Sequence, residues 1–134
     1  MAFVAKHRFA RIAPRKARLI MDLVRGRDVD DAISMLKFSK QRVSGMIEKV
    51  IKSAVANANE QETAQIRNTL YVAKAWVDPG PVIKRFQPKD RGKAYSIKKR
   101  TSHLVVTIDE REEGERASVS LKRTVGARHG RARQ

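Results

Sequence analysis

The chain has 134 residues, enough for one domain, and it carries 30 Lys and Arg residues against 14 Asp and Glu residues. The formal charge of +16 is unusual for a soluble enzyme and attracts polyanions, so nucleic acid is the first partner to consider, ahead of an anionic membrane surface and of acidic proteins. The absence of cysteine excludes disulfides, cysteine-based zinc sites and thiol catalysis.

The N-terminal basic region predicts a strand followed by a helix. Apolar and basic residues alternate over part of residues 3–12, which indicates a short strand with one solvated face. Pro14 suits the first turn of a helix over about residues 14–25, and Gly26 suits the position after its last turn. The first turns carry three basic residues, Arg15, Lys16 and Arg18. Cations are unfavourable at the positive end of a helix dipole, so this cluster favours a phosphate nearby.

Two further helices are predicted in the middle of the chain, where acidic and basic residues balance over residues 28–67. Asp28 can cap a short helix that ends near Phe38. A longer helix is predicted from Ser39 to about residue 58, because apolar residues recur there at helical spacing. Its apolar stripe could dock a partner helix, but Met and Val at this spacing are typical of a core, and we interpret the stripe as core packing.

A long β-hairpin is predicted over about residues 68–108, with arms over about 68–83 and 95–108 and a tip over about 83–95. Pro79 and Pro81 predict a bulged or bent first arm, because proline interrupts strand pairing. So long a ribbon cannot be buried in a core of this size, and an isolated hairpin is marginally stable in water. We therefore expect a partner outside the chain to order it.

The distal half of this hairpin combines cations with aromatic rings. Phe86 and Tyr95 lie among eight basic residues, Lys84, Arg85, Lys89, Arg91, Lys93, Lys98, Lys99 and Arg100. Cations bind the phosphate backbone and exposed rings stack on unpaired bases, a combination typical of RNA recognition. A solvated charged loop is the alternative interpretation of the same residues.

Other functions find little support in the sequence. His7, His103 and His129 lack the spacing of a metal site, and there is no nucleophile elbow, phosphate-binding loop or dinucleotide fingerprint. We therefore expect no enzyme activity, no metal and no cofactor. No apolar run approaches the ~20 residues that span a bilayer. The main rival to RNA is a DNA-bending protein whose β-arms wedge a proline into the minor groove, for which Pro88 is a candidate.

Four segments of the chain resemble the large-subunit ribosomal protein L twenty-two family. They are Pro14–Leu19 with Arg25 and Gly26, Lys49–Ala58, Gly80–Ala94 and Lys98–His103. Together the four segments span roughly residues 5–108. The chain departs from the family pattern at Ala13, where a capping Ser is usual, and at Lys89 and Asp90, where Arg and Ala are usual.

The resemblance implies an α+β fold in which three helices pack on a short antiparallel sheet and a long hairpin protrudes. Residues 1–108 would form a single rRNA-binding domain, followed by a basic C-terminal extension over residues 109–134. The family role is structural: it binds large-subunit rRNA, supports subunit assembly and lines the nascent-peptide exit tunnel with the hairpin tip, while the globular part lies near the tunnel exit. Neighbouring ribosomal proteins and the nascent polypeptide are the other implied partners. No membrane and no homo-oligomer are expected, and the implied location is the ribosome of the cytoplasm or of an organelle.

The resemblance also assigns site residues. Those expected to bind rRNA are Arg8, Arg11, Arg15, Lys16, Arg18, Lys84, Arg85, Arg91, Lys93, Lys98, Lys99, Arg100, Thr101, Ser102 and His103. Those expected at the tunnel tip are Lys84, Arg85, Phe86, Pro88, Lys89, Asp90, Arg91 and Gly92.

Overall fold

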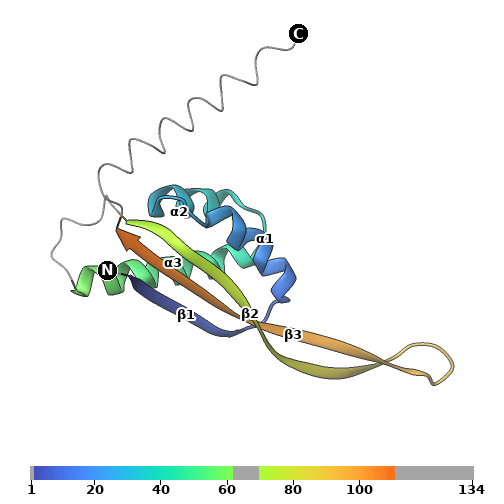
Figure 1. The fold of residues 1–134 in the computed structure, drawn as a ribbon. Coiled ribbons are helices and arrows are strands. Elements are labelled where there is room, and N and C mark those ends of the chain that lie inside the picture. The colour runs from blue at the N-terminus through green and yellow to red at the C-terminus, as the bar shows by residue number, and fades with distance from the viewer. Residues whose placement is uncertain (1, 62–69, 111–134) are drawn as a thin grey trace, which may run out of the picture.

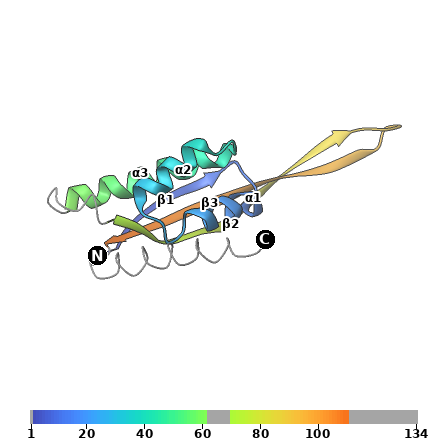
Figure 2. The same cartoon turned by 90° about the horizontal axis from the view of Figure 1, so that it is seen from above.

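A computed structural model describes residues 2–61 and 70–110 of the chain, and it confirms the α+β class (Figure 1). The elements follow in the order β1 (Phe3–Ala10), α1 (Pro14–Val24), α2 (Val29–Phe38), α3 (Arg42–Gln61), β2 (Leu70–Pro88) and β3 (Ala94–Glu110). All three helices lie beside the same half of the sheet, and the hairpin of β2 and β3 extends well past them (Figures 1 and 2).

The sheet has the order β1-β3-β2, with both pairs antiparallel, so the last strand in the chain is the central one. Leu104, Val106 and Ile108 of β3 face the helices and are fully buried. Val105 and Thr107 point to the opposite face and are also buried, between the side chains of the flanking strands. A strand covered on both faces explains why residues 104–108 form an unbroken run of apolar and β-branched residues.

The helices pack on one face of the sheet and enclose the core. α1 packs on β2, α3 packs on β1 and β3, and α2 packs on α3. Along α3, one face buries Val43, Ile47, Val50, Ile51, Ala54 and Ala58, at the spacing that the sequence predicts. The stripe of the longest helix is therefore core, as expected.

Several boundaries differ from the sequence prediction. β1 ends at Ala10, and α3 begins at Arg42 because Ser39 is extended (φ −72°, ψ 127°) as the C-cap of α2. Asp28 occupies the N-cap position of α2, but its side chain makes no capping hydrogen bond. Asp109 and Glu110, the first two residues of the predicted C-terminal extension, continue β3, and its remaining residues 111–134 lie outside the described part of the chain.

Three irregularities interrupt the ladders, and each reverses which residues point to a given face of the sheet. One lies between Val72 and Lys74, where Val72 accepts a hydrogen bond from the N–H of Gly26 and donates its own N–H to the carbonyl of Arg27 in the α1–α2 connection. Another lies between Pro79 and Val82, which confirms the bulge predicted at the two prolines. A third lies in β1, where two residues oppose the single residue His103 of β3.

The bulge in β1 holds Phe9 in a left-handed backbone conformation (φ 56°). This conformation costs a residue with a Cβ about 1–2 kcal/mol. The N–H of Phe9 donates to Nδ1 of His103 at 3.0 Å, and the two rings meet edge to face with their centroids 4.9 Å apart. Because of the extra residue, Ala10 returns to the buried face while Phe9 stays 58% exposed.

The hairpin narrows to a tip of residues 89–93, shorter than the tip predicted over residues 83–95. Regular pairing continues to the pair of Pro88 and Ala94. A proline fits at position 88 because it is the last paired residue of β2, where the ladder needs no N–H donor. The N–H of Lys93 donates to the carbonyl of Asp90 at 2.9 Å, with positive φ at Arg91 (44°) and Gly92 (74°). Two central residues with positive φ characterise a type I′ turn, whose twist matches that of the hairpin.

Candidate nucleic-acid interface

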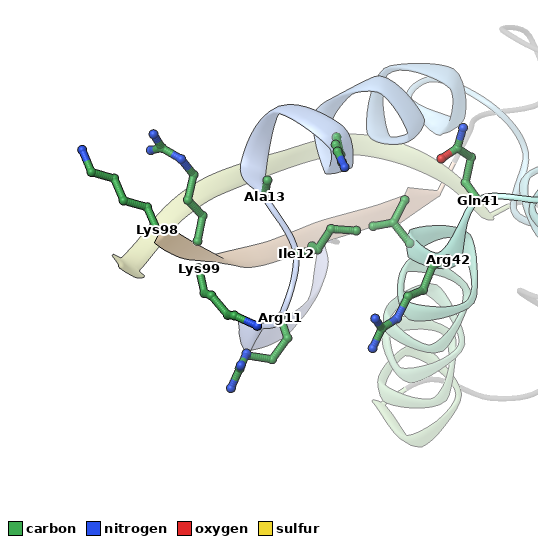
Figure 3. Close-up of a pocket in the computed structure, with 10 residues that line it drawn as sticks. Arg11, Ile12, Ala13, Gln41, Arg42, Lys98 and Lys99 are labelled. Carbon is green, nitrogen blue, oxygen red and sulfur yellow. The ribbon is translucent and has the colours of Figure 1, made fainter. Parts of the chain in front are cut away.

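A basic pocket of about 810 Å³ lies where the hairpin leaves the sheet, and it is lined from four parts of the chain (Figure 3). Six of its ten lining residues are cationic and none is acidic: Arg11, Lys16, Arg42, Lys98, Lys99 and Arg100. In Figure 3 the side chains of Arg11, Arg42 and Lys99 extend to the same side of the pocket. We call this site the basic pocket.

Two helices begin at the basic pocket and add to its positive potential. Ala13 precedes α1 and Gln41 precedes α3, and both residues line the pocket. Ala13 offers no side-chain acceptor and α1 has no acidic residue in its first turn, so the positive end of that helix meets no negative side chain there. Like charges held this close repel one another, and an anion such as a phosphate would relieve the repulsion.

The distal hairpin, defined as residues 82–100, continues this cationic surface away from the core. Every side chain in it is exposed except Ile83 and Ile97, which are half-buried. The two isoleucines lie diagonally across the ladder, because Ile83 pairs with Lys99 and Ile97 pairs with Arg85. Because the two isoleucines are only half-buried and every other side chain is exposed, the distal hairpin has no core of its own, as the sequence predicts.

The predicted tip residues all lie in the exposed part of the distal hairpin. Phe86 is 77% exposed, and Tyr95 is 48% exposed on the opposite face of the ladder. The ammonium group of Lys89 lies 5.6 Å from the centroid of the Tyr95 ring, a cation–π distance. The tip therefore presents one free aromatic ring and one ring already covered by a cation.

Arg18 and Thr101 are predicted binding residues whose side chains make hydrogen bonds within the chain, and Ser102 is a third whose side chain is buried. Arg18 donates from Nη2 to the carbonyl of Val77 at 3.2 Å, on the free edge of β2. Thr101 is 4% exposed, and its hydroxyl donates to the carbonyl of Pro81 at 2.7 Å. Ser102 is fully buried. The side chains of Thr101 and Ser102 thus lie inside the hairpin base rather than on the cationic surface.

Three further predicted residues do not line the basic pocket. Arg15 is exposed in the first turn of α1, next to Lys16 in the chain. Arg8 and His103 lie on the outer face of the sheet, opposite the helices, where they line a smaller pocket. Among the predicted cations, the fold brings together Arg11, Lys16 and residues 98–100 most closely.

Sequence reasoning missed Arg42 and Gln41. Both lie in the charge-balanced middle of the chain, where the sequence predicts helices that pack in the core. The available signal was the position of Arg42 at the first turn of a helix, the same feature that drew attention to Arg15 and Lys16. Only the packing of α3 on β1 and β3 brings it beside Arg11 and Lys99.

No helix within residues 2–61 and 70–110 is long and apolar enough to cross a membrane. Over the same ranges, no three His, Asp or Glu side chains gather closely enough to hold a metal ion.

Comparison with known proteins shows that the chain is similar to ribosomal proteins. The profile of ribosomal protein L22p/L17e matches residues 5–109, which include every described strand and helix apart from the ends of β1 and β3. The large ribosomal subunit protein uL22 of Bdellovibrio bacteriovorus is 44% identical over 111 residues, covering 83% of this chain and 100% of that protein.

Proposed function

This chain belongs to the ribosomal protein L22p/L17e family, and on that premise we propose that it binds large-subunit rRNA through the basic pocket and the distal hairpin. It is a structural, non-enzymatic constituent of the large ribosomal subunit, and its place is the ribosome of the cytoplasm. Residues 1–108 act as one rRNA-binding domain in this proposal. The observation that carries it is the convergence of six cations and no acidic residue on the basic pocket.

Within this proposal, the side chains divide into contacting and positioning residues. Those that contact rRNA are Arg8, Arg11, Arg15, Lys16, Arg42, Lys84, Arg85, Arg91, Lys93, Lys98, Lys99 and Arg100. Arg18 uses one N–H on β2 and has further N–H groups for a phosphate. Thr101 and Ser102, being buried, fix the base of the hairpin from which the neighbouring cations extend.

We further propose that the distal hairpin lies between rRNA segments and that its tip reaches the peptide exit tunnel, with the globular part near the exit. The support is physical: residues 82–100 bury almost nothing within the chain, so their order depends on surroundings that supply contacts on both faces. Early binding of this chain would help the subunit assemble. Neighbouring ribosomal proteins and the nascent polypeptide at Phe86 and Lys89 are its other partners in this proposal.

The rRNA proposal is tested by affinity for a large-subunit rRNA fragment against duplex DNA of equal charge, between about 50 and 200 mM salt. Several phosphate contacts should weaken both affinities by ~10³ or more over this range. A preference for rRNA that persists at the highest salt supports recognition of RNA shape. Equal affinities throughout would overturn it and leave the DNA-bending protein as the hypothesis to pursue.

The basic pocket is tested by Arg42→Ala and Arg100→Ala, with Lys37→Ala on α2 as the matched control, since Lys37 is exposed and lines none of these pockets. Each pocket variant should reduce the salt slope of rRNA binding by about one charge. The control should leave the slope unchanged. An unchanged slope in the pocket variants would remove the basic pocket from the interface.

The tunnel placement is tested in assembled ribosomes with a photo-crosslinking group at position 86. We expect it to label the nascent chain, whereas the same group at position 38, exposed on α2, should not. Equal labelling from both positions, or labelling from position 38 alone, would contradict the placement.

A further inference from the structure

The outer face of the sheet, opposite the helices, carries a second concentration of rings and cations. Lys6 and Arg8 of β1 alternate with the buried residues Phe3 and Ala5. In β2, Trp76 and Asp78 alternate in the same way with Ala75 and Val77, and they pair with Val105 and His103 of β3. No described helix covers this face of the sheet (Figures 1 and 2).

A pocket of about 320 Å³ occupies this face, near the lower end of the size range of small-ligand sites, about 300–1,000 Å³. It is lined by Lys6, Arg8, Phe9, Trp76, Asp78, His103 and Val105. Phe9 is 58% exposed and Trp76 is 39% exposed. The ring N–H of Trp76 donates to Oδ2 of Asp78 at 3.1 Å, which links the one acidic lining residue to the indole.

The bulge in β1 is what brings Phe9 to this pocket. In an unbroken strand Phe9 would share the face of Phe3 and Ala5, whereas the extra residue turns it toward His103 on the outer face. Bulges recur where a strand must redirect one side chain. Here the redirected side chain is a large ring left more than half exposed in an unfavourable backbone conformation, so its position is not explained by burial.

We propose that this outer-face pocket holds one unstacked base of an RNA loop, with Phe9 and Trp76 contacting the base and Lys6 and Arg8 contacting its flanking phosphates. The inference rests on the proposed function, because RNA is the partner, but it adds a site and a mode of recognition that the basic pocket does not supply. Aromatic side chains with adjacent cations are the recurring means by which proteins bind unpaired bases. Among the described residues Lys6 and Arg8 form no ion pair, so both remain available to phosphate.

The test uses the fluorescence of Trp76, which is the single tryptophan of the chain. The full-length protein is titrated with a short single-stranded RNA and with duplex RNA of equal charge. A base stacked in the pocket should quench the indole, so single-stranded RNA should quench it at lower concentration than duplex RNA does. Equal quenching by both would indicate backbone contact alone and would overturn the proposal.

Phe9→Gly separates binding from folding, because glycine adopts positive φ without strain and keeps the backbone N–H that donates to His103. We expect the urea midpoint of this variant not to fall, while its affinity for single-stranded RNA falls by about 5- to 150-fold, the effect of losing one stacked ring. Phe38→Ala is the matched control, since Phe38 is a ring 89% exposed on α2. Equal affinity of Phe9→Gly and Phe38→Ala would refute the pocket.

The same measurements distinguish a failure of the outer-face pocket from a failure of the rRNA proposal. If the rRNA fragment binds with salt-resistant preference but does not quench Trp76, the outer-face pocket is wrong and the basic pocket stands. If the protein binds the rRNA fragment no better than duplex DNA, both the rRNA proposal and the outer-face pocket fail.

Discussion

Gly80→Ala should destabilise the protein at the point where the hairpin leaves the sheet. A Cβ on Gly80 would lie 2.5 Å from the hydroxyl oxygen of Thr101 and 3.2 Å from its carbonyl carbon. The hydroxyl would have to turn away, losing its hydrogen bond to Pro81 and leaving a buried polar group unpaired, which costs about 1–3 kcal/mol. The close backbone contact adds about 1–3 kcal/mol of overpacking.

We expect the net effect to be smaller than this sum, because replacing glycine also restricts the unfolded chain and returns about 0.4–1 kcal/mol. We expect a loss of roughly 2–4 kcal/mol in the free energy of unfolding, measured by urea titration with circular dichroism. Gly45→Ala is the control, since no atom lies within 4 Å of its added Cβ inside α3, and it should stabilise by about 0.5–1 kcal/mol.

A double variant checks the mechanism. Thr101→Ala removes the atom closest to the new Cβ, so Gly80→Ala should cost less in that background, with a coupling of at least about 0.5 kcal/mol. Strictly additive effects, or a Gly80→Ala variant as stable as Gly45→Ala, would refute the argument that steric conflict with Thr101 requires glycine at position 80.

Three further predictions follow from local contacts. Ala13→Ser should stabilise α1 by about 1 kcal/mol in urea titrations, since the N-cap has no side-chain acceptor; no gain would show that another group already serves there. The hydrogen bond and charge of Lys52, 2.7 Å away, hold the pKa of Glu48 below its usual value, so this pair stabilises the fold above the ordinary carboxyl pKa and the contribution is lost as pH falls through the lowered pKa. Lys52→Ala should raise that pKa in NMR titrations, and an unmoved value would contradict the assignment. Residues 84–96 should exchange amide hydrogens rapidly in the free protein while residues 104–108 stay protected; uniform protection would show that the hairpin is stable alone.

The sequence predicts those elements whose pattern is local. The spacing of Val43, Ile47 and Ile51 is sufficient to predict a helix and its buried face, and the apolar, β-branched run that ends at Ile108 is sufficient to predict the returning arm of the hairpin. The prolines at 79 and 81 even locate a bulge, because proline cannot donate to the ladder. In each case the cause lies within a few residues of its effect.

What the sequence does not predict depends on partners far along the chain. The bulge at Phe9 exists because His103, 94 residues away, accepts its N–H. Arg42 joins Arg11 only through the packing of α3 against the sheet. The resemblance marks Thr101 as a binding residue because of its motif. A motif does not state which side chains of a strand point inward, and the side chain of Thr101 points inward.

The position of β3 at the centre of the sheet has a consequence for synthesis. Phe3 pairs with Ile108, and β2 pairs with the same strand, so neither outer strand has its partner until the last strand has been translated. Contacts this distant in sequence close slowly, because chain entropy must be lost first. The helices can form as they emerge from their own ribosome, but their apolar faces stay uncovered until then. Folding of this protein therefore completes in one late step, after nearly all of the folded part has been made.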